Sequence, residues 1–509
     1  MPGGDKVNET FLEVKNINKS YGGVIALSNV DLDIKKGEIH CLVGENGSGK
    51  STLVKIITGV VEPELGGEII IEGVKFSKLT PLEAFKRGIQ VVHQDFSLFP
   101  NLSVAENISI AQYIKHSKVI HWNRMKKIAK ETLDKLEINL PIDALVGSLP
   151  IAEQQLIAIC RALASEAKLI IMDEPTSSLT REEVIHLFNI LRTLKEKGIS
   201  ILFISHKLDE ILEIGERITI LRDGKKIATI NINEASKQKL TYLMTGKEIF
   251  YQKYFYKPNN KEIVLEVKNL SKKGQYKNIS FKLYKGEVLG IVGPLGSGKT
   301  ELALSLFGMN PPNSGEIYIK GKFVELKSNI DAINQGIGYI PEDRLNQGLV
   351  LNQSIENNIS ITILKKLLNR LKLIDSLRKK EITKEAIRKF NIKTPSIKIP
   401  VKNLSGGNQQ KVVIAKWFLI QPQILIMDSP TIGIDVLAKN SIYETIRELA
   451  SHGVSIILIS EEIPEVLNNC NRILVMRKGK IMGEFLSEKM TEEELYQKVW
   501  SKEIEVSIS

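Results

Sequence analysis

The sequence predicts an α/β protein built from two tandem domains, each with a mainly parallel sheet at its core. The first observation is length, because 509 residues exceed what one hydrophobic core usually supports. The second is an internal repeat, since the stretch 37–51 returns with closely similar residues at 286–300. The third is a set of apolar, strand-length runs that are separated by helix-length amphipathic stretches. These runs lie at 169–172, 200–204, 424–427 and 455–459.

Both repeats begin in the same way. Alternating apolar residues at 11–14 and 263–267 predict an opening strand in each. A second strand and a glycine-rich turn follow. The turn leads into a helix that is expected to start at 52–58 in the first repeat and at 301–307 in the second.

A short connector is expected between the repeats. The segment 247–262 is aromatic and basic and contains Pro-Asn-Asn, which is turn chemistry. We therefore expect a first domain at 1–246 and a second domain at 263–509.

The composition is that of a folded globular protein, with 43% hydrophobic and 25% charged residues. No run of about eighteen apolar residues occurs, and the first ten residues lack the pattern of a secretory signal. We therefore expect neither a membrane span nor export from the cytosol. Cys41, Cys160 and Cys470 are scattered without metal-ligand spacing, which favours buried core thiols in a reducing compartment.

The net charge of +11 fits a polyanion partner and an anionic membrane surface equally well. Much of the excess lies in the basic stretch 363–390. A solvated helical face is the favoured interpretation of this stretch, and contact with a membrane or a partner is the second one.

Each repeat carries a glycine-rich loop with the spacing G-x-x-x-x-G-K-[S/T], at 44–51 and 293–300. Glycines let backbone N–H groups wrap phosphates, the lysine reaches the terminal phosphates, and the final hydroxyl binds Mg²⁺. Two matches in register argue against unrelated glycine turns. The expected phosphate-binding residues are Gly44, Asn46, Gly47, Ser48, Gly49, Lys50, Ser51 and Thr52 in the first repeat, and Gly293, Gly296, Ser297, Gly298, Lys299 and Thr300 in the second.

An acidic residue ends one apolar run in each repeat. Asp173 and Asp428 stand where a carboxylate can hold Mg²⁺, although such a run alone is often only a core strand. Glu174 follows in the first repeat, at a position suited to a general base for an attacking water. The second repeat has Ser429 there.

At matched spacing after these aspartates, the next strand ends at His206 in the first repeat and at Glu461 in the second. A surface residue at a helix start is the plain interpretation of His206. The matched spacing favours contact with a terminal phosphate instead.

A third motif lies upstream of each aspartate, as Leu-Ser-Gly-Gly-Asn-Gln-Gln at 404–410 and as Leu-Pro-Ile-Ala-Glu-Gln-Gln at 149–155. A helix that begins near Asn408 with a hydroxyl and bare backbone at its N-terminus is an anion site. Pro150 and Ala152 remove the hydroxyl and one glycine from the first copy. The residues expected to bind phosphate are Ser405, Gly406 and Gly407.

Taken together, these motifs resemble the ATP-binding cassette family, and the resemblance covers nearly the whole chain. The tandem arrangement is more closely similar to the ATPases of bacterial monosaccharide importers, such as those for ribose, xylose and galactose. Gln94 lies in Val-His-Gln-Asp-Phe, and the second repeat has Ile-Pro-Glu-Asp-Arg, ending at Arg344, where that glutamine is expected.

The resemblance implies two tandem P-loop NTPase domains of the ABC type. Each is expected to have a mainly parallel sheet core, an antiparallel β subdomain and a helical subdomain. It also implies ATP and Mg²⁺, two transmembrane permease subunits and an extracytoplasmic substrate-binding protein. The chain is then peripheral on the cytoplasmic face of the cell membrane, with Gln94 and Glu342 near the permease, and no nucleic acid is expected.

By the same resemblance, Tyr21 stacks on adenine, whereas the alignment puts Tyr276 opposite Leu27 and leaves no such aromatic in the second repeat. The two halves are expected to close head to tail around ATP, with one competent and one degenerate ATP site. The implied catalytic residues are Glu174, His206 and Gln94, and the implied Mg²⁺ ligands are Ser51, Gln94, Asp173, Thr300 and Asp428.

Two alternatives stay open at this point. One is an importer of nucleosides or autoinducer-type sugars, because the contacts with the transported molecule belong to the partner proteins. The other is a tandem ATPase that acts on ribosomes or nucleic acid, which a basic chain suits. Such proteins resemble this one less, because they typically join their halves by a long charged helical linker, and the connector here is short.

Overall fold

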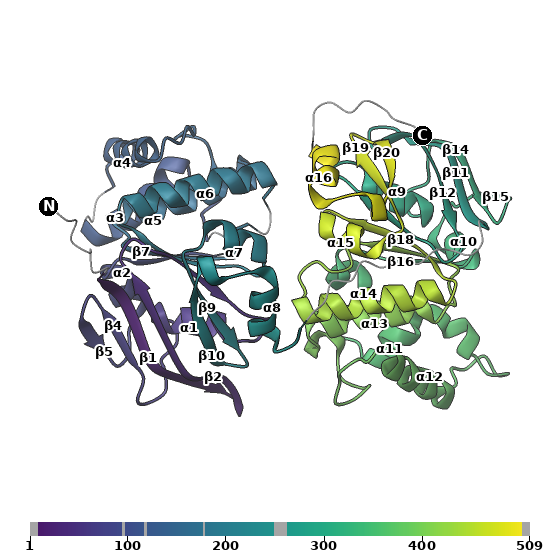
Figure 1. The fold of residues 1–509 in the computed structure, drawn as a ribbon, viewed down its shortest axis with the longest axis horizontal. Helices are drawn as coiled ribbons and strands as arrows, with labels where there is room; N and C mark the ends of the chain where they lie inside the picture. The colour runs from purple at the N-terminus through teal and green to yellow at the C-terminus, as the bar shows by residue number, and fades with distance from the viewer. Residues whose placement is uncertain (1–8, 94–96, 117–119, 177–178, 249–261, 501–509) are drawn as a thin grey trace. The chain divides into compact units, whose positions relative to one another are not determined.

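The computed structural model describes residues 9–93, 97–116, 120–176, 179–248 and 262–500 (Figure 1). It separates into two compact units, Met1–Ile249 and Phe250–Ser509. Most of the connector predicted at 247–262 lies outside the described residues. The two units repeat the same architecture, which confirms the α/β class and the tandem organisation.

The centre of the first unit is a six-stranded sheet in the order β10-β9-β3-β8-β7-β6. All neighbours in it run parallel except β9 and β10, which are antiparallel. The strand that leads into the first glycine-rich loop, β3, therefore lies inside the sheet. The strands are β3 (Ile39–Val43), β6 (Ile89–Val92), β7 (Leu169–Asp173), β8 (Ser200–Ile204), β9 (Arg217–Arg222) and β10 (Lys225–Asn231).

The second unit has the corresponding sheet, in the order β20-β19-β13-β18-β17-β16, again with only the last hairpin antiparallel. Its strand β13 takes the place of β3. The strands are β13 (Val288–Val292), β16 (Ile337–Ile340), β17 (Ile424–Asp428), β18 (Ser455–Ser460), β19 (Arg472–Arg477) and β20 (Lys480–Leu486).

Both faces of the parallel sheet are buried, which explains why its strands are continuous apolar runs. Within β3, Ile39, Cys41 and Val43 belong to the core on the side of most of the helices, whereas Leu42 belongs to the core shared with α1 and the antiparallel sheet. This is the two-residue period of a strand. All three cysteines are free and buried, as the sequence predicts.

A four-stranded antiparallel sheet forms the predicted β subdomain of each unit, in the orders β2-β1-β4-β5 and β12-β11-β14-β15. In the first unit the strands are β1 (Thr10–Tyr21), β2 (Val24–Lys35), β4 (Glu68–Ile71) and β5 (Val74–Phe76). In the second they are β11 (Ile263–Lys272), β12 (Tyr276–Tyr284), β14 (Ser314–Ile319) and β15 (Lys322–Val324).

Helices form the third part of each unit, and within each unit they lie at the end opposite the antiparallel strands (Figure 1). In the first unit this subdomain contains α3 (Val104–His116), α4 (Trp122–Lys135) and α5 (Ile151–Ala164). In the second it contains α11 (Ile355–Ser360), α12 (Ser376–Lys389) and α13 (Gly406–Phe418). Among the described residues, none of the helices is both long and apolar enough to cross a bilayer.

The remaining helices pack on the sheets. They are α1 (Lys50–Ile57), α2 (Pro81–Lys86), α6 (Arg181–Glu196), α7 (Leu208–Ile214) and α8 (Lys237–Thr245) in the first unit. In the second they are α9 (Lys299–Leu306), α10 (Asn329–Asn334), α14 (Val436–Ser451), α15 (Ile463–Asn469) and α16 (Glu492–Trp500).

The basic stretch 363–390 is only partly a helix. Its second part is α12, which Asp375 caps by accepting hydrogen bonds from two backbone N–H groups. Thr383 and Ala386 are buried, while Arg378, Lys384 and Arg388 point to solvent. The solvated helical face expected from the sequence is therefore confirmed for this helix.

A buried ion pair ties the start of the loop-bearing strand to the neighbouring strand in each unit. In the second unit, Arg472 Nε lies 2.6 Å from Glu287 Oε1, with 13% and 2% of the two side chains exposed. Glu287 also accepts a hydrogen bond from the N–H of Tyr284 at the end of β12. The matched pair in the first unit is Arg217 and Glu38, at 3.3 Å. One carboxylate thus joins both sheets.

We expect Arg472→Met to lower the free energy of unfolding of the second unit by about 3 kcal/mol, because it leaves the carboxylate of Glu287 buried without its cation. Urea unfolding, followed by the fluorescence of Trp417 and Trp500 in a Trp122→Phe background, measures the change. The control is Lys285→Met, which breaks an exposed pair with Glu262 and should cost about 0.5 kcal/mol or less. Equal losses for both variants would contradict the prediction.

Candidate functional site

The first glycine-rich loop connects β3 to α1 and is held in a closed shape by its own lysine. Lys50 Nζ donates hydrogen bonds to the carbonyls of Gly44 and Glu45, at 2.7 and 3.0 Å. Gly47 and Gly49 have φ angles of +84° and +100°, in the left-handed region that favours glycine. The loop therefore has the wrapped backbone that phosphate binding needs.

The base of this loop is tightly packed and its tip is open. A Cβ on Gly44 would lie 2.3 Å from a carbonyl of β9, and a Cβ on Gly49 would lie 2.6 Å from a carbonyl of β2. No atom lies within 4 Å of the corresponding position on Gly47. The buried hydroxyl of Ser48 has no hydrogen-bond partner.

The acidic residues of the first unit lie beside this lysine. Asp173 ends β7, and burial raises its pKa, with a further contribution from Glu174. Glu174 Oε1 is 3.0 Å from Nδ1 of His206, which follows β8, and this hydrogen bond lowers the pKa of Glu174. Both carboxylates act electrostatically on Lys50, whose pKa burial lowers. Lys50, Asp173, Glu174 and His206 thus form one cluster.

Other predicted residues of the first unit lie around this cluster or outside the described part of the chain. Gln94 lies outside the described residues. Its neighbour His93 acts electrostatically on Asp173. Tyr21 ends β1 with 46% of its surface exposed, and the ammonium of Lys19 lies 5.7 Å from its ring centroid. On the loop and the helix it leads into, the structure leaves Asn46 and Ser51 exposed and Thr52 partly buried.

The second glycine-rich loop repeats the first between β13 and α9. Lys299, only 6% exposed, donates hydrogen bonds to the carbonyl of Gly293 at 2.6 Å and to Oγ of Ser297 at 3.1 Å. Gly296 and Gly298 have φ angles of +73° and +94°. The backbone geometry for phosphate is therefore present in both units.

The carboxylate that ends β17 is more deeply buried than its counterpart. Asp428 is 1% exposed, and burial raises its pKa to about 6. It accepts hydrogen bonds from the hydroxyls of Tyr339, at 3.3 Å, and Thr300, while its Oδ1 has no partner. The first unit has Val91 at the matched position of the sheet, so this hydrogen bond has no counterpart there. The sequence did not predict Tyr339 as a residue of the site. In the sequence, only the hydroxyl of Tyr339 within an otherwise apolar strand indicates such a contact.

Two carboxylates, those of Glu461 and Glu342, act on the second lysine at the positions where the first unit has His206 and Gln94. Glu461 Oε1 lies 3.7 Å from Lys299 Nζ. Burial and the charge of Glu461 raise the pKa of Glu342. Ser429 has a φ angle of +46°, and Glu174 has +49°, so the backbone is conserved at this position while the carboxylate is absent.

The two motif helices differ at their N-termini. Helix α13 begins at Gly406, slightly before the predicted start near Asn408, and Ser405 is its N-cap residue. A Cβ on Gly407 would lie 2.4 Å from the Cβ of Ala438, so α13 and α14 touch there. Helix α5 begins after Pro150, which has no side-chain hydrogen bond to offer.

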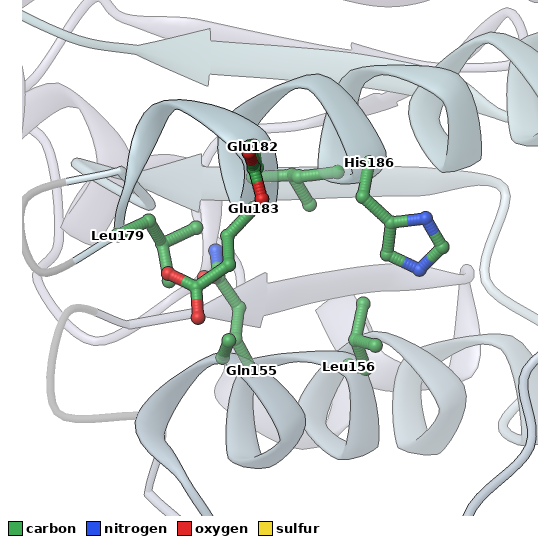
Figure 2. Close-up of a pocket in the computed structure, with 8 residues that line it drawn as sticks. Gln155, Leu156, Leu179, Glu182, Glu183 and His186 are labelled. Atoms are coloured by element: carbon green, nitrogen blue, oxygen red, sulfur yellow. The ribbon is translucent and has the colours of Figure 1, made fainter. Parts of the chain in front are cut away.

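Helices α5 and α6 of the first unit enclose a pocket of about 260 Å³ at the corresponding place (Figure 2). Ala152 and Glu183 line it, at the positions that Gly407 and Ala438 occupy in the second unit. Gln155 also lines it and has a buried amide without a partner, but the matched Gln410 has a buried unpartnered amide nitrogen too. A buried amide without a partner is therefore common to α5 and α13. The two units differ instead in how closely α5 packs on α6 and α13 packs on α14, and the packing is looser in the first unit.

The sequence pattern of the ABC transporter family matches residues 27–177 and 276–432, one match in each unit. The chain belongs to the ABC transporter family. Its two units are ATP-binding cassettes, and the chain is an ATPase. The clusters around Lys50 and Lys299 lie at the residues that the sequence predicts to bind ATP, and they are the candidate ATP sites.

Relatives match over nearly the full chain. A ribose import ATP-binding protein of Clostridium tetani is 43% identical over 95% of this chain and 96% of its own. A putative ribose/galactose/methyl galactoside import ATP-binding protein of Geobacillus kaustophilus is 42% identical over 96% of this chain and 97% of its own. A solved ATP-binding cassette of an ABC transporter in its ADP conformation is 28% identical, with a TM-score of 0.42, over 47% of this chain and all of its own.

We expect His206→Ala to raise the pKa of Glu174, because the hydrogen bond with His206 is the largest of the effects that shift it and lowers it. As the predicted general base, Glu174 must be ionised to accept a proton from the attacking water, so we expect activity to fall as the pH drops through this pKa. The acidic limb of the pH profile of ATP hydrolysis should therefore move to higher pH. Measured kcat between acidic and neutral pH checks it, with His186→Ala as the control. An acidic limb that stays in place in the His206 variant would contradict it.

Proposed function

We propose that this ATPase drives the import of a monosaccharide or related small sugar. It works on the cytoplasmic face of the membrane with two transmembrane permease subunits and an extracytoplasmic substrate-binding protein. The observation that carries the solute class is the match, at 42–43% identity over nearly the whole chain, to proteins named for ribose and galactose import. The observation that carries the chemistry is the cluster of Lys50, Asp173, Glu174 and His206.

In the first ATP site each residue has one role. Lys50 binds the terminal phosphates, and Ser51, Asp173 and Gln94 hold Mg²⁺. Mg²⁺ held by these residues would supply positive charge that stabilises the charge developing during phosphoryl transfer. Glu174, whose pKa the hydrogen bond with His206 lowers, orients the attacking water and accepts its proton. His206 keeps the carboxylate in place through its hydrogen bond.

The second ATP site binds nucleotide and hydrolyses it slowly at best. Its loop has the phosphate-binding geometry, and the unpartnered Oδ1 of Asp428 fits a bound cation. Ser429, however, offers no carboxylate to the water. Glu461 places a negative charge beside Lys299, where the first unit has a histidine. A missing general base alone typically costs about 10²- to 10⁴-fold in rate.

We infer that the two units pair head to tail, so that the motif helix of each faces the lysine loop of the other. In this arrangement all of the substituted residues belong to the same ATP site. The first lysine loop then meets the intact residues Ser405, Gly406 and Gly407. The second loop meets the helix that begins with Pro150 and carries Ala152. One proposed site therefore contains all of the predicted residues, and the other contains all of the residues that differ from the predicted pattern.

The alternative of a tandem ATPase that acts on ribosomes or nucleic acid is not favoured. Relatives along 95% of the chain are named as import proteins. An importer of nucleosides or autoinducer-type sugars differs from the proposal only in the solute. Uptake of labelled ribose, galactose and a nucleoside by a deletion strain tests the solute class directly.

We expect Glu174→Gln and Ser429→Ala to have unequal effects in the assembled transporter. Glu174→Gln should lower kcat by about 10²- to 10⁴-fold and leave ATP binding intact, because it removes the base without touching the phosphate ligands. Ser429→Ala should leave kcat within about twofold, because the serine has no proton-accepting role. Steady-state hydrolysis and equilibrium binding of ATP measure the two quantities.

The controls are Lys50→Ala and Lys299→Ala, which remove the phosphate contact of one site at a time. Lys50→Ala should abolish Mg²⁺-dependent hydrolysis, whereas Lys299→Ala should weaken nucleotide binding at the second site. If Glu174→Gln retained half of the activity, both sites would hydrolyse ATP and the unequal arrangement would be wrong.

We also expect the chain to sediment with membranes only when its permease subunits are co-expressed, because its attachment rests on protein contacts around Gln94 and Glu342. Fractionation with and without the permease, at low and high salt, measures this. Salt-sensitive binding without the permease would instead assign the attachment to the basic face of α12.

A further inference from the structure

Arg344 lies in the loop 341–348 after β16 and reaches a distant part of the second unit. Its Nη1 donates a hydrogen bond to the carbonyl of Ile432 at 2.7 Å, and its Nη2 donates to the carbonyl of Gly433 at 3.3 Å. Both carbonyls belong to the loop that runs from β17 to α14, directly after Ser429. One guanidinium therefore bridges two loops that are far apart in the sequence.

The same guanidinium lies over the first residue of α13. A Cβ on Gly406 would come within 2.9 Å of Arg344 Nη2, so a side chain at this position would displace the end of the arginine. Glycine at this position thus admits the arginine, and its bare backbone is at the same time the predicted anion site. Arg344 thus binds the loop after β17 and lies beside the N-terminus of the motif helix.

The loop that carries Arg344 is itself fixed at both ends. Asp343 Oδ1 accepts hydrogen bonds from the N–H groups of Leu345 and Asn346, at 3.2 and 3.1 Å. Lys416 Nζ, near the C-terminal end of α13, donates to the carbonyl of Gly348 at 2.5 Å. The loop is therefore held at its start by Asp343 and attached to α13 at its end by Lys416, which makes the position of Arg344 well defined.

The first unit has different residues at the positions of both Arg344 and Gly406. Aligning Glu342 with Gln94 places Phe96 opposite Arg344, and aligning the motif helices places Ile151 opposite Gly406. Ile151 is 50% exposed, and Phe96 lies outside the described residues. A cation and a glycine in one unit are thus matched by two apolar residues in the other.

We propose that Arg344 is a positioning residue for ATP hydrolysis. It holds the N-terminus of α13 and the loop after β17 in the arrangement that receives the γ-phosphate of ATP. The inference rests on the proposed function, in which α13 completes the hydrolysing site. It adds to that site a residue of the second unit, which acts on the rate through α13.

The test is Arg344→Ala in the assembled transporter. A motif helix displaced by about 1 Å costs on the order of 10²-fold in rate, so we expect kcat to fall by about 10- to 100-fold. The KM for ATP should change by less than about threefold, because the P-loop of the first unit keeps its ligands. An unchanged kcat, or a loss confined to KM, would overturn the proposal.

Arg344→Lys separates position from charge. Lysine keeps the positive charge but lacks the planar fork that reaches two carbonyls at once. We expect its kcat to stay within about threefold of that of Arg344→Ala. Full activity in the lysine variant would show that charge at the helix N-terminus suffices, and it would overturn the bridging role. The control is Arg378→Ala, on the exposed face of α12, which should keep wild-type kcat and KM.

A double-mutant cycle keeps the proposal testable if Arg344→Ala loses stability. Gly406→Ala drives a Cβ against the guanidinium, so the two changes should be non-additive in kcat. Additive effects would mean that the residues act independently and would overturn it. Failure of this inference is distinct from failure of the proposed function: an inactive Glu174→Gln together with a fully active Arg344→Ala rejects only the role of Arg344.

Discussion

The site depends on one constraint, the parallel direction of the strands in the central sheet. Parallel strands end at the same edge, so β3, β7 and β8 deliver the loop of Lys50, the Asp173–Glu174 pair and His206 to one place. Strands β13, β17 and β18 do the same for Lys299, Asp428 and Glu461. The buried pairs of Glu38 and Glu287 hold the starts of β3 and β13 against their neighbours, and therefore support the site from the other end.

The two units show how chemistry can change while the backbone does not. Glu174 and Ser429 share a left-handed conformation, and each donates its N–H to a carbonyl near the end of the neighbouring strand, that of Ile204 or Ile459, at 2.9 Å in both units. A left-handed conformation at a residue other than glycine is unfavourable and persists only where the surrounding structure fixes it. The second unit therefore has the same costly geometry at this position without the carboxylate.

Much of the architecture could be predicted because it depends on local patterns. The apolar runs predicted β7, β8, β17 and β18, and the glycine spacing predicted both lysine loops. The hydrogen bond of Tyr339 to Asp428 and that of Arg344 to Ile432 could not be predicted, because each joins segments almost ninety residues apart and depends on side-chain direction. The start of α13 at Gly406 was missed because glycine is a poor helix former, and here tertiary packing decides. The role of Gln94 stays a prediction.

The burial of all three cysteines has a practical consequence for studying movement within the chain. Burial raises the pKa of Cys160 to about 12, and it raises those of Cys41 and Cys470 as well, so none is a reactive thiolate when the chain is folded. Alkylation then requires that the surrounding structure open. Because Cys41 lies in β3 and Cys470 directly follows α15, the rates of their alkylation report separately on the opening of the two cassettes.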